Sequence, residues 1–199
     1  MLVLASASPR RQELLRNAGI AFIAQPTDIP EVPREGELPR SFAERLAREK
    51  ASAVARERPD DFVLGADTIV VVDGQILGKP ADAPDAARML RLLSGRTHEV
   101  ITAACLAGPS RHRVKTRNQQ IETAFEDTRS ETTRVTMSAL SEDDIDSYIA
   151  TGEPMDKAGA YAIQGMASRW ITRVEGDYSN VVGLPVAPVF NMLREHGAI

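Results

Sequence analysis

An aspartate lies inside an apolar stretch of this sequence, FVLGADTIVVV, in which Asp67 is the only charged residue. Because a buried carboxylate is costly unless it is ion-paired, hydrogen-bonded or bound to a metal ion, Asp67 needs a specific partner. Two interpretations stay open at this point. Asp67 is either a structural residue that caps a β-bulge made by Gly65, or an active-site residue that binds a metal ion or acts as a general base.

Two arginines follow a run of small residues near the start of the sequence, in LASASPRR. Ser8 suits the N-cap of a helix, and Pro9 suits its first position. Arg10 and Arg11 then fall in the first helical turn, where the helix dipole disfavours cations. They are either solvated surface charges or ligands of an anion that is bound at the backbone N–H groups of the helix N-terminus.

Two lysines stand out by their sequence context. Lys50 is spaced by four from Leu46 and from Val54, so it falls on the apolar stripe of a helix. It either extends its amine to solvent at the edge of this stripe or points into a cleft. Lys79 lies between a glycine and a proline, as many exposed turn residues do, but it belongs to the same predicted hairpin as Asp67.

The segment GEPMDKAGAYAIQG, residues 152–165, combines small residues with two acids, a lysine and Gln164. This composition is typical of an ordinary loop. It would also suit recognition of a nucleobase edge, because a glutamine amide carries both a hydrogen-bond donor and an acceptor.

The elements that must position these side chains alternate between strand and helix, which predicts an α/β fold. A β-hairpin with Asp73-Gly74 at its turn adds an antiparallel pair, so we expect a mixed sheet. Residues 107–131 are polar and without a clear period, and we expect them to form an exposed insertion or a long hairpin tip. The pattern predicts helices at 9–18, 41–56 (opened by a capping box of Ser41 and Glu44), 84–93, 141–152 and from about 185, and strands at 2–6, early in 21–33, within 61–80, at 98–108, 132–140 and 168–177.

Composition narrows the classes of function. The 199 residues suffice for one domain or for two small lobes that share a core, and the formal net charge is −4. We therefore expect no general attraction to nucleic acid or to an anionic membrane, and an anionic ligand would need a local basic cluster. The single cysteine, Cys105, lies in an apolar run and is expected in the core of a cytoplasmic protein. No phosphate-binding P-loop, G-x-G-x-x-G or H-E-x-x-H motif occurs, and the apolar start is too short for a signal peptide or a membrane span.

Taken together, the motifs resemble those of the Maf family of nucleotide pyrophosphatases. The resemblance implies a single domain over residues 1–199, with two lobes around a central cleft and an elongated, twisted mixed sheet flanked by helices, as in the inosine-triphosphate pyrophosphatases. It also implies a homodimer. The matching segments are ASASPRR (5–11), IPE (29–31), LAREKA (46–51), GADTIVV (65–71), GKP (78–80), LSGRTHEV (93–100), ATGEPMDKAGAYAIQG (150–165) and EGDYSNVVGLP (175–185).

The resemblance further implies a reaction. A nucleoside triphosphate is hydrolysed to the monophosphate and pyrophosphate with a divalent cation, Mg²⁺ or Mn²⁺. The segment at 152–165 is similar to that of the branch acting on dTTP and UTP, although Ala162 replaces a more frequent glycine. Two alternatives remain: a house-cleaning enzyme for modified nucleotides, and a non-catalytic nucleotide-binding regulator of septum formation.

The roles of individual residues follow from the same resemblance. Asp67 matches the proton acceptor, and whether it acts as base, as metal ligand or as both stays open. Glu31 and Asp67 are the expected metal ligands. Arg10, Thr68 and Gln164 match positions linked to substrate choice, and the polar residues expected to line the cleft are Ser8, Arg11, Glu31, Lys50 and Lys79.

Overall fold

The computed structural model describes residues 1–109, 114–115, 120–121 and 124–199. These residues divide into two compact units, each assembled from separate stretches of the chain. Unit 1 comprises Met1–Asp67, Ala103–Ser130 and Gly183–Ile199, and unit 2 comprises Thr68–Thr102 and Glu131–Val182.

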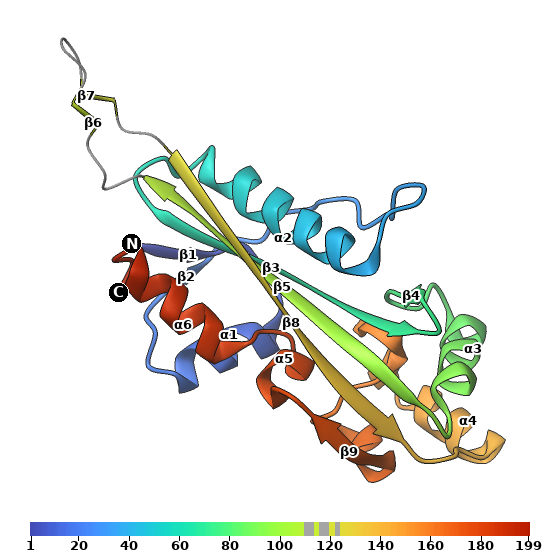
Figure 1. Cartoon of the computed structure of the whole chain (residues 1–199). Helices are drawn as coiled ribbons and strands as arrows, with labels where there is room; N and C mark the ends of the chain where they lie inside the picture. Colours follow the sequence, from blue (N-terminus) through green and yellow to red (C-terminus); the bar gives the residue numbers. More distant parts are fainter. Residues whose placement is uncertain (110–113, 116–119, 122–123) are drawn as a thin grey trace. The chain divides into compact units, whose positions relative to one another are not determined.

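A mixed sheet carries the fold, as the sequence predicts (Figure 1). Its strand order is β2-β1-β3-β5-β8-β9, and β4 pairs with β3. β1 is parallel to β2 and β3, whereas the β3–β4 and β8–β9 pairs are antiparallel. The strands are β1 (Leu2–Leu4), β2 (Ile23–Ala24), β3 (Phe62–Val72), β4 (Gln75–Leu77), β5 (Thr97–Pro109), β8 (Ala124–Met137) and β9 (Ile171–Glu175), with a separate antiparallel pair of β6 (Val114–Lys115) and β7 (Gln120–Ile121).

The helices lie close to their predicted positions, although α5 was not expected. Among the described residues, no helix has the length and apolar character needed to cross a membrane. The helices are α1 (Pro9–Asn17), α2 (Pro39–Ala55), α3 (Ala83–Leu93), α4 (Glu142–Ala150), α5 (Tyr178–Val182) and α6 (Val186–Glu195), and short 3₁₀ segments cover Glu153–Asp156, Ala158–Ala160 and Met166–Trp170.

The two faces of β3 in unit 1 have different partners. Phe62, Leu64 and Ala66 belong to an apolar cluster that includes Leu15 of α1 and Leu193 of α6. Side chains alternate along a strand, so the residues between them point to the opposite face. That second face is the one on which α2 packs, as the surroundings of Gly65 show.

Gly65 allows the backbone of α2 to approach β3 closely. A Cβ atom at this position would lie 2.3 Å from the carbonyl oxygen of Ala47 and 2.6 Å from the nitrogen of Ala51. Contacts this short with backbone atoms exclude any side chain. Gly65 therefore serves helix packing, a role that the sequence interpretation of a β-bulge did not assign to it.

The predicted start of α2 is wrong. The helix begins at Pro39, with Leu38 at the N-cap and no side-chain cap, so Ser41 lies inside the first turn. Proline is well suited to the first helical position because its fixed φ angle is already helical and its missing N–H group is not needed there. Glu44, the expected partner in a capping box, instead accepts a hydrogen bond from Ser130 Oγ at 2.6 Å.

Part of the segment predicted as an exposed insertion or a long hairpin tip belongs to the sheet. Residues 107–109 end β5, with Ala107 and Gly108 buried, and residues 124–131 begin the neighbouring strand β8. The polar composition that suggested exposure comes partly from ion pairs, such as that of Arg129 with Asp127 at 2.7 Å. Residues 110–113, 116–119 and 122–123 lie outside the described residues, so the expectation for them stays a prediction.

In unit 2 the predicted turn chemistry is confirmed. Asp73 and Gly74 connect β3 to β4 with φ angles of 50° and 76°, the left-handed values that a tight hairpin turn requires. Ser141 caps α4 in a capping box with Asp144. Each of these turns is specified by two or three neighbouring residues, which explains why the sequence alone predicts them.

A histidine is buried in unit 2 beside a tyrosine. His98 is 2 % exposed, its Nε2 atom lies 2.8 Å from Tyr161 Oη, and its Nδ1 atom has no hydrogen-bond partner. Burial lowers the pKa of His98 to about 4, because the charged imidazolium would lose its hydration there. His98 is therefore neutral at physiological pH.

The low pKa of His98 predicts a loss of stability in acid. Below the ordinary pKa of 6.5, the unfolded chain binds a proton that the folded chain does not bind until about pH 4. The free energy of unfolding should therefore fall between pH 6.5 and pH 4, by up to about 3 kcal/mol from this group. Urea unfolding at pH 7.5 and pH 4.5 measures the change, and the decrease should be smaller in His98→Gln. An equal decrease in both proteins would contradict the assignment.

Candidate active site

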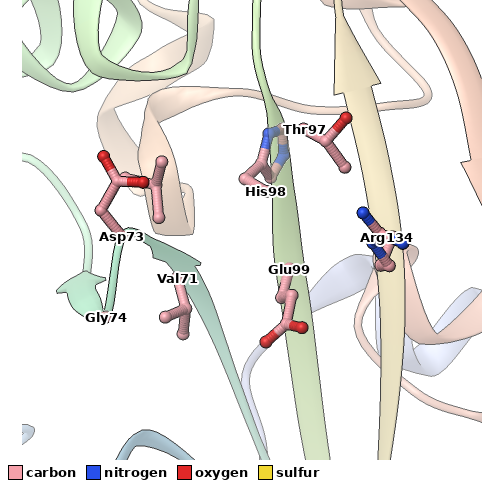
Figure 2. A pocket seen from close by; sticks show the side chains of 8 residues that line it. Val71, Asp73, Gly74, Thr97, His98, Glu99 and Arg134 are labelled. Carbon is pink, nitrogen blue, oxygen red and sulfur yellow. The ribbon is translucent and has the colours of Figure 1, made fainter.

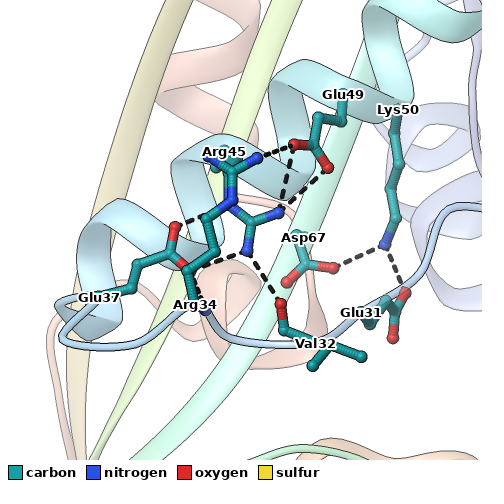
Figure 3. A network of polar contacts seen from close by, with 8 residues as sticks. All are labelled: Glu31, Val32, Arg34, Glu37, Arg45, Glu49, Lys50 and Asp67. Atoms are coloured by element: carbon teal, nitrogen blue, oxygen red, sulfur yellow. Dashed lines mark hydrogen bonds and ion pairs between the residues drawn. The ribbon is translucent and has the colours of Figure 1, made fainter.

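A lysine joins two carboxylates at the centre of the candidate site in unit 1 (Figure 3). Lys50 Nζ lies 2.6 Å from Glu31 Oε1 and 2.7 Å from Asp67 Oδ1. The side chains of Lys50 and Asp67 are only 10 % and 7 % exposed, whereas that of Glu31 is 37 % exposed. The partner that the buried Asp67 requires is therefore Lys50, and the lysine points inward, not to solvent.

The close packing of α2 on β3 positions this pair. Ala47 and Ala51 of α2 contact Gly65, and Lys50 lies on the same helix between them. Asp67 follows Gly65 by two residues, so it points to the same face of β3. Gly65 thus determines the distance between the Lys50 amine and the Asp67 carboxylate.

Burial has a marked effect on Asp67. Desolvation raises the pKa of its carboxyl group, and the positive charges of Lys50 and Arg11 partly oppose this effect. A carboxylate with a raised pKa is a stronger base than an exposed aspartate. The environment of Asp67 is therefore suited to accepting a proton.

Arg11 lies within electrostatic reach of the same acids. Its Nε atom donates to the carbonyl oxygen of Gly183 at 2.8 Å, and Nη1 donates to Ser6 Oγ at 3.2 Å. Burial lowers the pKa of Arg11, while the charges of Asp67 and Glu31 raise it. The guanidinium is therefore held by the protein beside the acids, in the first turn of α1.

The predicted N-cap of α1 is confirmed. The Ser8 side chain accepts a hydrogen bond from the backbone nitrogen of Arg11, at 3.5 Å. This contact places Ser8 at the helix N-terminus, so it caps the helix as well as being a candidate ligand-binding residue. Arg10 is half-buried one position before Arg11, and its expected role in substrate choice stays a prediction.

A second ion-pair network ties the loop that carries Glu31 to α2 (Figure 3). Arg45 binds both carboxylate oxygens of Glu37, at 2.7 and 2.8 Å, and donates to the carbonyl oxygen of Val32 at 3.1 Å. It also binds Glu49, one turn further along the helix, at 3.2 Å. The hydrogen bond from Arg45 lowers the pKa of Glu37 to about 2, so this attachment persists in moderate acid.

Removing the Arg45 guanidinium should loosen this loop. In Arg45→Met we expect trypsin to cleave after Arg34 about tenfold faster, because local opening of the loop becomes easier. Mass spectrometry of the first fragments measures the rate. Arg48→Met is the matched control, since Arg48 contacts Glu126 only at 3.9 Å and should leave cleavage at Arg34 unchanged. Equal cleavage of wild type and Arg45→Met would contradict the proposed attachment.

In unit 2, Thr68 begins a chain of hydrogen bonds that the sequence did not reveal. Thr68 Oγ1 lies 2.9 Å from Thr102 Oγ1, and Thr102 Oγ1 donates to the carbonyl oxygen of Asn180 at 2.8 Å. A hydroxyl has one hydrogen, so Thr102 must accept from Thr68. The Thr68 hydrogen is thereby committed to the protein, and its oxygen can act toward a ligand as an acceptor.

Asn180 holds this chain in place. Its Nδ2 atom donates to the carbonyl oxygen of Val100 at 3.0 Å and to Thr133 Oγ1 at 2.9 Å, while its Oδ1 atom accepts from the nitrogen of Thr102 at 3.1 Å. The residue is fully buried. Its place within the motif EGDYSNVVGLP was the only available signal of its importance.

The segments of Lys79 and Gln164 also belong to unit 2. Both side chains are exposed. The nitrogen of Gly159 donates to the carbonyl oxygen of Gly78 at 3.0 Å, which brings the turn before Lys79 to the 158–165 segment. The structure thus joins two of the sequence motifs within this unit.

A pocket of about 290 Å³ in unit 2 lies apart from these residues (Figure 2). None of the sequence-predicted site residues lines it. Asp73 and Glu99 contribute carboxylates, and Arg134 contributes a single cation. This balance does not suit a triphosphate, which needs several cations. The pocket is lined by Val71, Val72, Asp73, Gly74, Thr97, His98, Glu99 and Arg134.

Comparison with known proteins identifies the family. The family model described as Maf-like protein matches residues 1–196. The chain belongs to the Maf family. The dTTP/UTP pyrophosphatase of Koribacter versatilis is 57 % identical over 198 residues, which cover 100 % of this chain and 95 % of that protein. The dTTP/UTP pyrophosphatase of Syntrophomonas wolfei is 50 % identical, over 98 % of this chain and 96 % of that protein. The solved nucleoside triphosphatase (dITP/XTP pyrophosphatase) of Mycobacterium abscessus is 14 % identical, with a TM-score of 0.38, and covers 76 % of this chain and 94 % of that one.

The acidic residues of this Maf-family chain fit a divalent cation shared with a ligand. Glu31 and Asp67 both lie within hydrogen-bond distance of the Lys50 amine, so their carboxylates are close neighbours. Among the described residues, no group of three or more acid, histidine or cysteine side chains could hold a metal ion. Mg²⁺ usually takes one or two carboxylates together with water and substrate phosphates, and two carboxylates are what this site offers.

Proposed function

We propose that the chain is a nucleoside triphosphate pyrophosphatase, a hydrolase that converts dTTP and UTP to the nucleoside monophosphate and pyrophosphate. The observation that carries this function is the buried Lys50–Asp67 ion pair. Lys50 also binds a second acid, Glu31, which lies on a loop. The relatives named dTTP/UTP pyrophosphatase, which match nearly the whole chain at about half identity, support the choice of substrate.

Asp67 is the proposed catalytic base. Lys50 binds Oδ1, so the carboxylate is held in one orientation and its second oxygen can bind a water molecule. The water oxygen forms a bond to the α-phosphorus while its proton passes to Asp67. The bond from the α-phosphorus to the bridging oxygen breaks, and its electron pair leaves with pyrophosphate.

The charge balance of the site supports a role for a divalent cation. Arg11 and Lys50 carry two positive charges, and Glu31 and Asp67 carry two negative charges. These four residues are neutral together, whereas a triphosphate brings roughly four negative charges. Mg²⁺ or Mn²⁺, held by Glu31 and Asp67, would neutralise phosphate charge and polarise the phosphorus–oxygen bonds. Arg10 and Lys79 are the further cations that we assign to the phosphates, and Ser8 is a proposed neutral hydrogen-bonding partner.

Gln164 and Thr68 are the proposed specificity residues in unit 2. The glutamine amide can pair with the edge of a pyrimidine that presents an N–H group beside a carbonyl. Thr68 adds an acceptor oxygen, because its own hydrogen is donated to Thr102. The homodimer expected from the family resemblance and the cytoplasmic location expected from the single cysteine stay predictions.

A substrate panel tests this function. Pyrophosphate release is measured with dTTP, UTP, CTP, modified pyrimidine nucleotides and 7-methyl-GTP, each with Mg²⁺ or Mn²⁺. We expect the highest kcat/KM for dTTP and UTP. A higher value for a modified nucleotide would instead assign a house-cleaning role, and nucleotide binding without pyrophosphate release would assign a regulator.

A further inference from the structure

The proposed base-reading residue sits on a short turn in unit 2. The nitrogen of Gly165 donates to the carbonyl oxygen of Ala162 at 3.1 Å and closes the turn around Gln164. Among the residues that the structure describes, no hydrogen bond or ion pair holds the exposed Gln164 side chain. Its position therefore depends on how the backbone of the turn is held.

Both ends of this turn are tied to one pair of side chains. The nitrogen of Ala162 donates to Tyr148 Oη at 3.1 Å. The nitrogen of Met166 donates to both carboxylate oxygens of Glu153, at 3.2 and 3.3 Å. Tyr148 Oη in turn donates to Glu153 Oε1 at 2.7 Å. The tyrosine hydroxyl accepts once and donates once, so the two side chains form a continuous bridge across the turn.

The bridge is itself held firmly. Tyr148, on α4, is fully buried and packs edge-on against Trp170, with ring centroids 5.5 Å apart. Burial is the main cause that raises the pKa of Tyr148, so the hydroxyl keeps its hydrogen at any working pH. The nitrogen of Glu153 donates to Thr151 Oγ1 at 3.1 Å, which fixes the start of the segment after α4.

Gly165 shows how tightly the carboxylate is seated. A Cβ atom at this position would lie 2.1 Å from Glu153 Oε1. A larger residue at this position would force the carboxylate to move from its place against the turn. The Glu153 carboxylate therefore packs directly against Gly165, the residue that follows Gln164.

We propose that Tyr148 and Glu153 are positioning residues that hold the Gln164 turn and thereby set base selectivity. This inference rests on the proposed function, in which Gln164 contacts the base. Neither residue touches the nucleotide in this proposal. Each acts through the turn, because a side chain without protein partners discriminates between ligands only when its backbone is fixed.

Removing the bridge should lower selectivity more than turnover. In Tyr148→Phe the ring remains but both hydrogen bonds of the hydroxyl are lost. We expect the ratio of kcat/KM for dTTP to that for CTP to fall by about tenfold. The kcat for dTTP should change by less than about threefold. Glu153→Ala should have the same effect. Glu153→Gln should retain most of the selectivity, because the amide oxygen can still accept from Tyr148 Oη and from the nitrogen of Met166, as Glu153 Oε1 does.

A double-mutant cycle separates positioning from general damage. Gln164→Ala should lower the same ratio, and adding Tyr148→Phe to it should change the ratio no further. Tyr161→Phe is the matched control, since its buried hydroxyl contacts His98 and makes no bond to the turn. A loss of selectivity in Tyr148→Phe that persists undiminished in the Gln164→Ala background would overturn the inference. An unchanged ratio in Tyr148→Phe would overturn it as well.

A binding measurement distinguishes failure of this inference from failure of the proposed function. Calorimetry with the α,β-imido analogues of dTTP and CTP, each with Mg²⁺, reports base selectivity without hydrolysis. A wild-type chain that releases no pyrophosphate removes the proposed function. The inference still stands if that chain prefers the dTTP analogue and Tyr148→Phe loses the preference, and it falls if wild type and variant bind both analogues alike.

Discussion

Asp67→Asn is expected to lower kcat for pyrophosphate release from dTTP by about two to four orders of magnitude, the usual contribution of a general base. The amide cannot accept the proton of the attacking water. Its oxygen can still accept the hydrogen bond from Lys50 that Asp67 Oδ1 accepts at 2.7 Å, so the fold should persist. Initial rates and thermal unfolding of the purified variant measure the two effects.

The control for this substitution is Asp73→Asn. Asp73 is an exposed residue of the β3–β4 turn, paired with Arg96, and asparagine tolerates its left-handed backbone conformation. We expect nearly wild-type activity in this control. Turnover of Asp67→Asn within a few-fold of wild type would exclude Asp67 as the base, whereas a loss of turnover supports it only when the melting temperature is unchanged.

Gly65→Ala should damage both stability and activity although residue 65 belongs to no proposed site. The added Cβ would lie 2.3 Å from the Ala47 carbonyl oxygen, so α2 must move away from β3. Overpacking against backbone should cost about 3 kcal/mol of unfolding free energy. The movement would also carry Lys50 away from Asp67, and a displacement of about 1 Å can reduce kcat about 100-fold. Urea unfolding and initial rates measure both losses.

Gly108→Ala distinguishes displacement of the site from simple crowding. A Cβ at Gly108 would lie 2.7 Å from a ring carbon of Phe62, a side chain that can shift, on the same sheet. This variant should lose some stability but retain its turnover. If Gly65→Ala were as active as wild type at a temperature where the variant is folded, the packing of α2 would not be what positions Lys50.

Local patterns allowed much of the fold to be predicted. The turn at Asp73-Gly74, the Ser8 cap and the Ser141 cap each depend on neighbouring residues, and each appears in the structure. Lys50 was expected on the apolar stripe of its helix and is buried there. Cys105 is buried as predicted, and burial raises its pKa to about 11, which suits an unreactive thiol.

Contacts between distant parts of the chain could not be predicted in this way. The sequence marked Lys50 and Asp67 separately, but only the packing at Gly65 brings them together. The bonds from the 162–166 turn to Tyr148 and Glu153 join residues 14 and 13 positions apart, and the sequence pattern gave no prediction of them. The Asn180 network joins residues about 50 to 80 positions apart in the chain, and spacing carries no signal for such partners.

The Lys50 amine between Glu31 and Asp67 should also affect how a divalent cation and a nucleotide bind to the free protein. The folded chain carries its own counter-ions, so a divalent cation that arrives alone encounters two acids whose charges Lys50 and Arg11 already offset. A cation that arrives with a triphosphate brings the opposite charge with it. Cation and nucleotide should therefore strengthen each other's binding, and thermodynamic linkage requires the two enhancements to be equal.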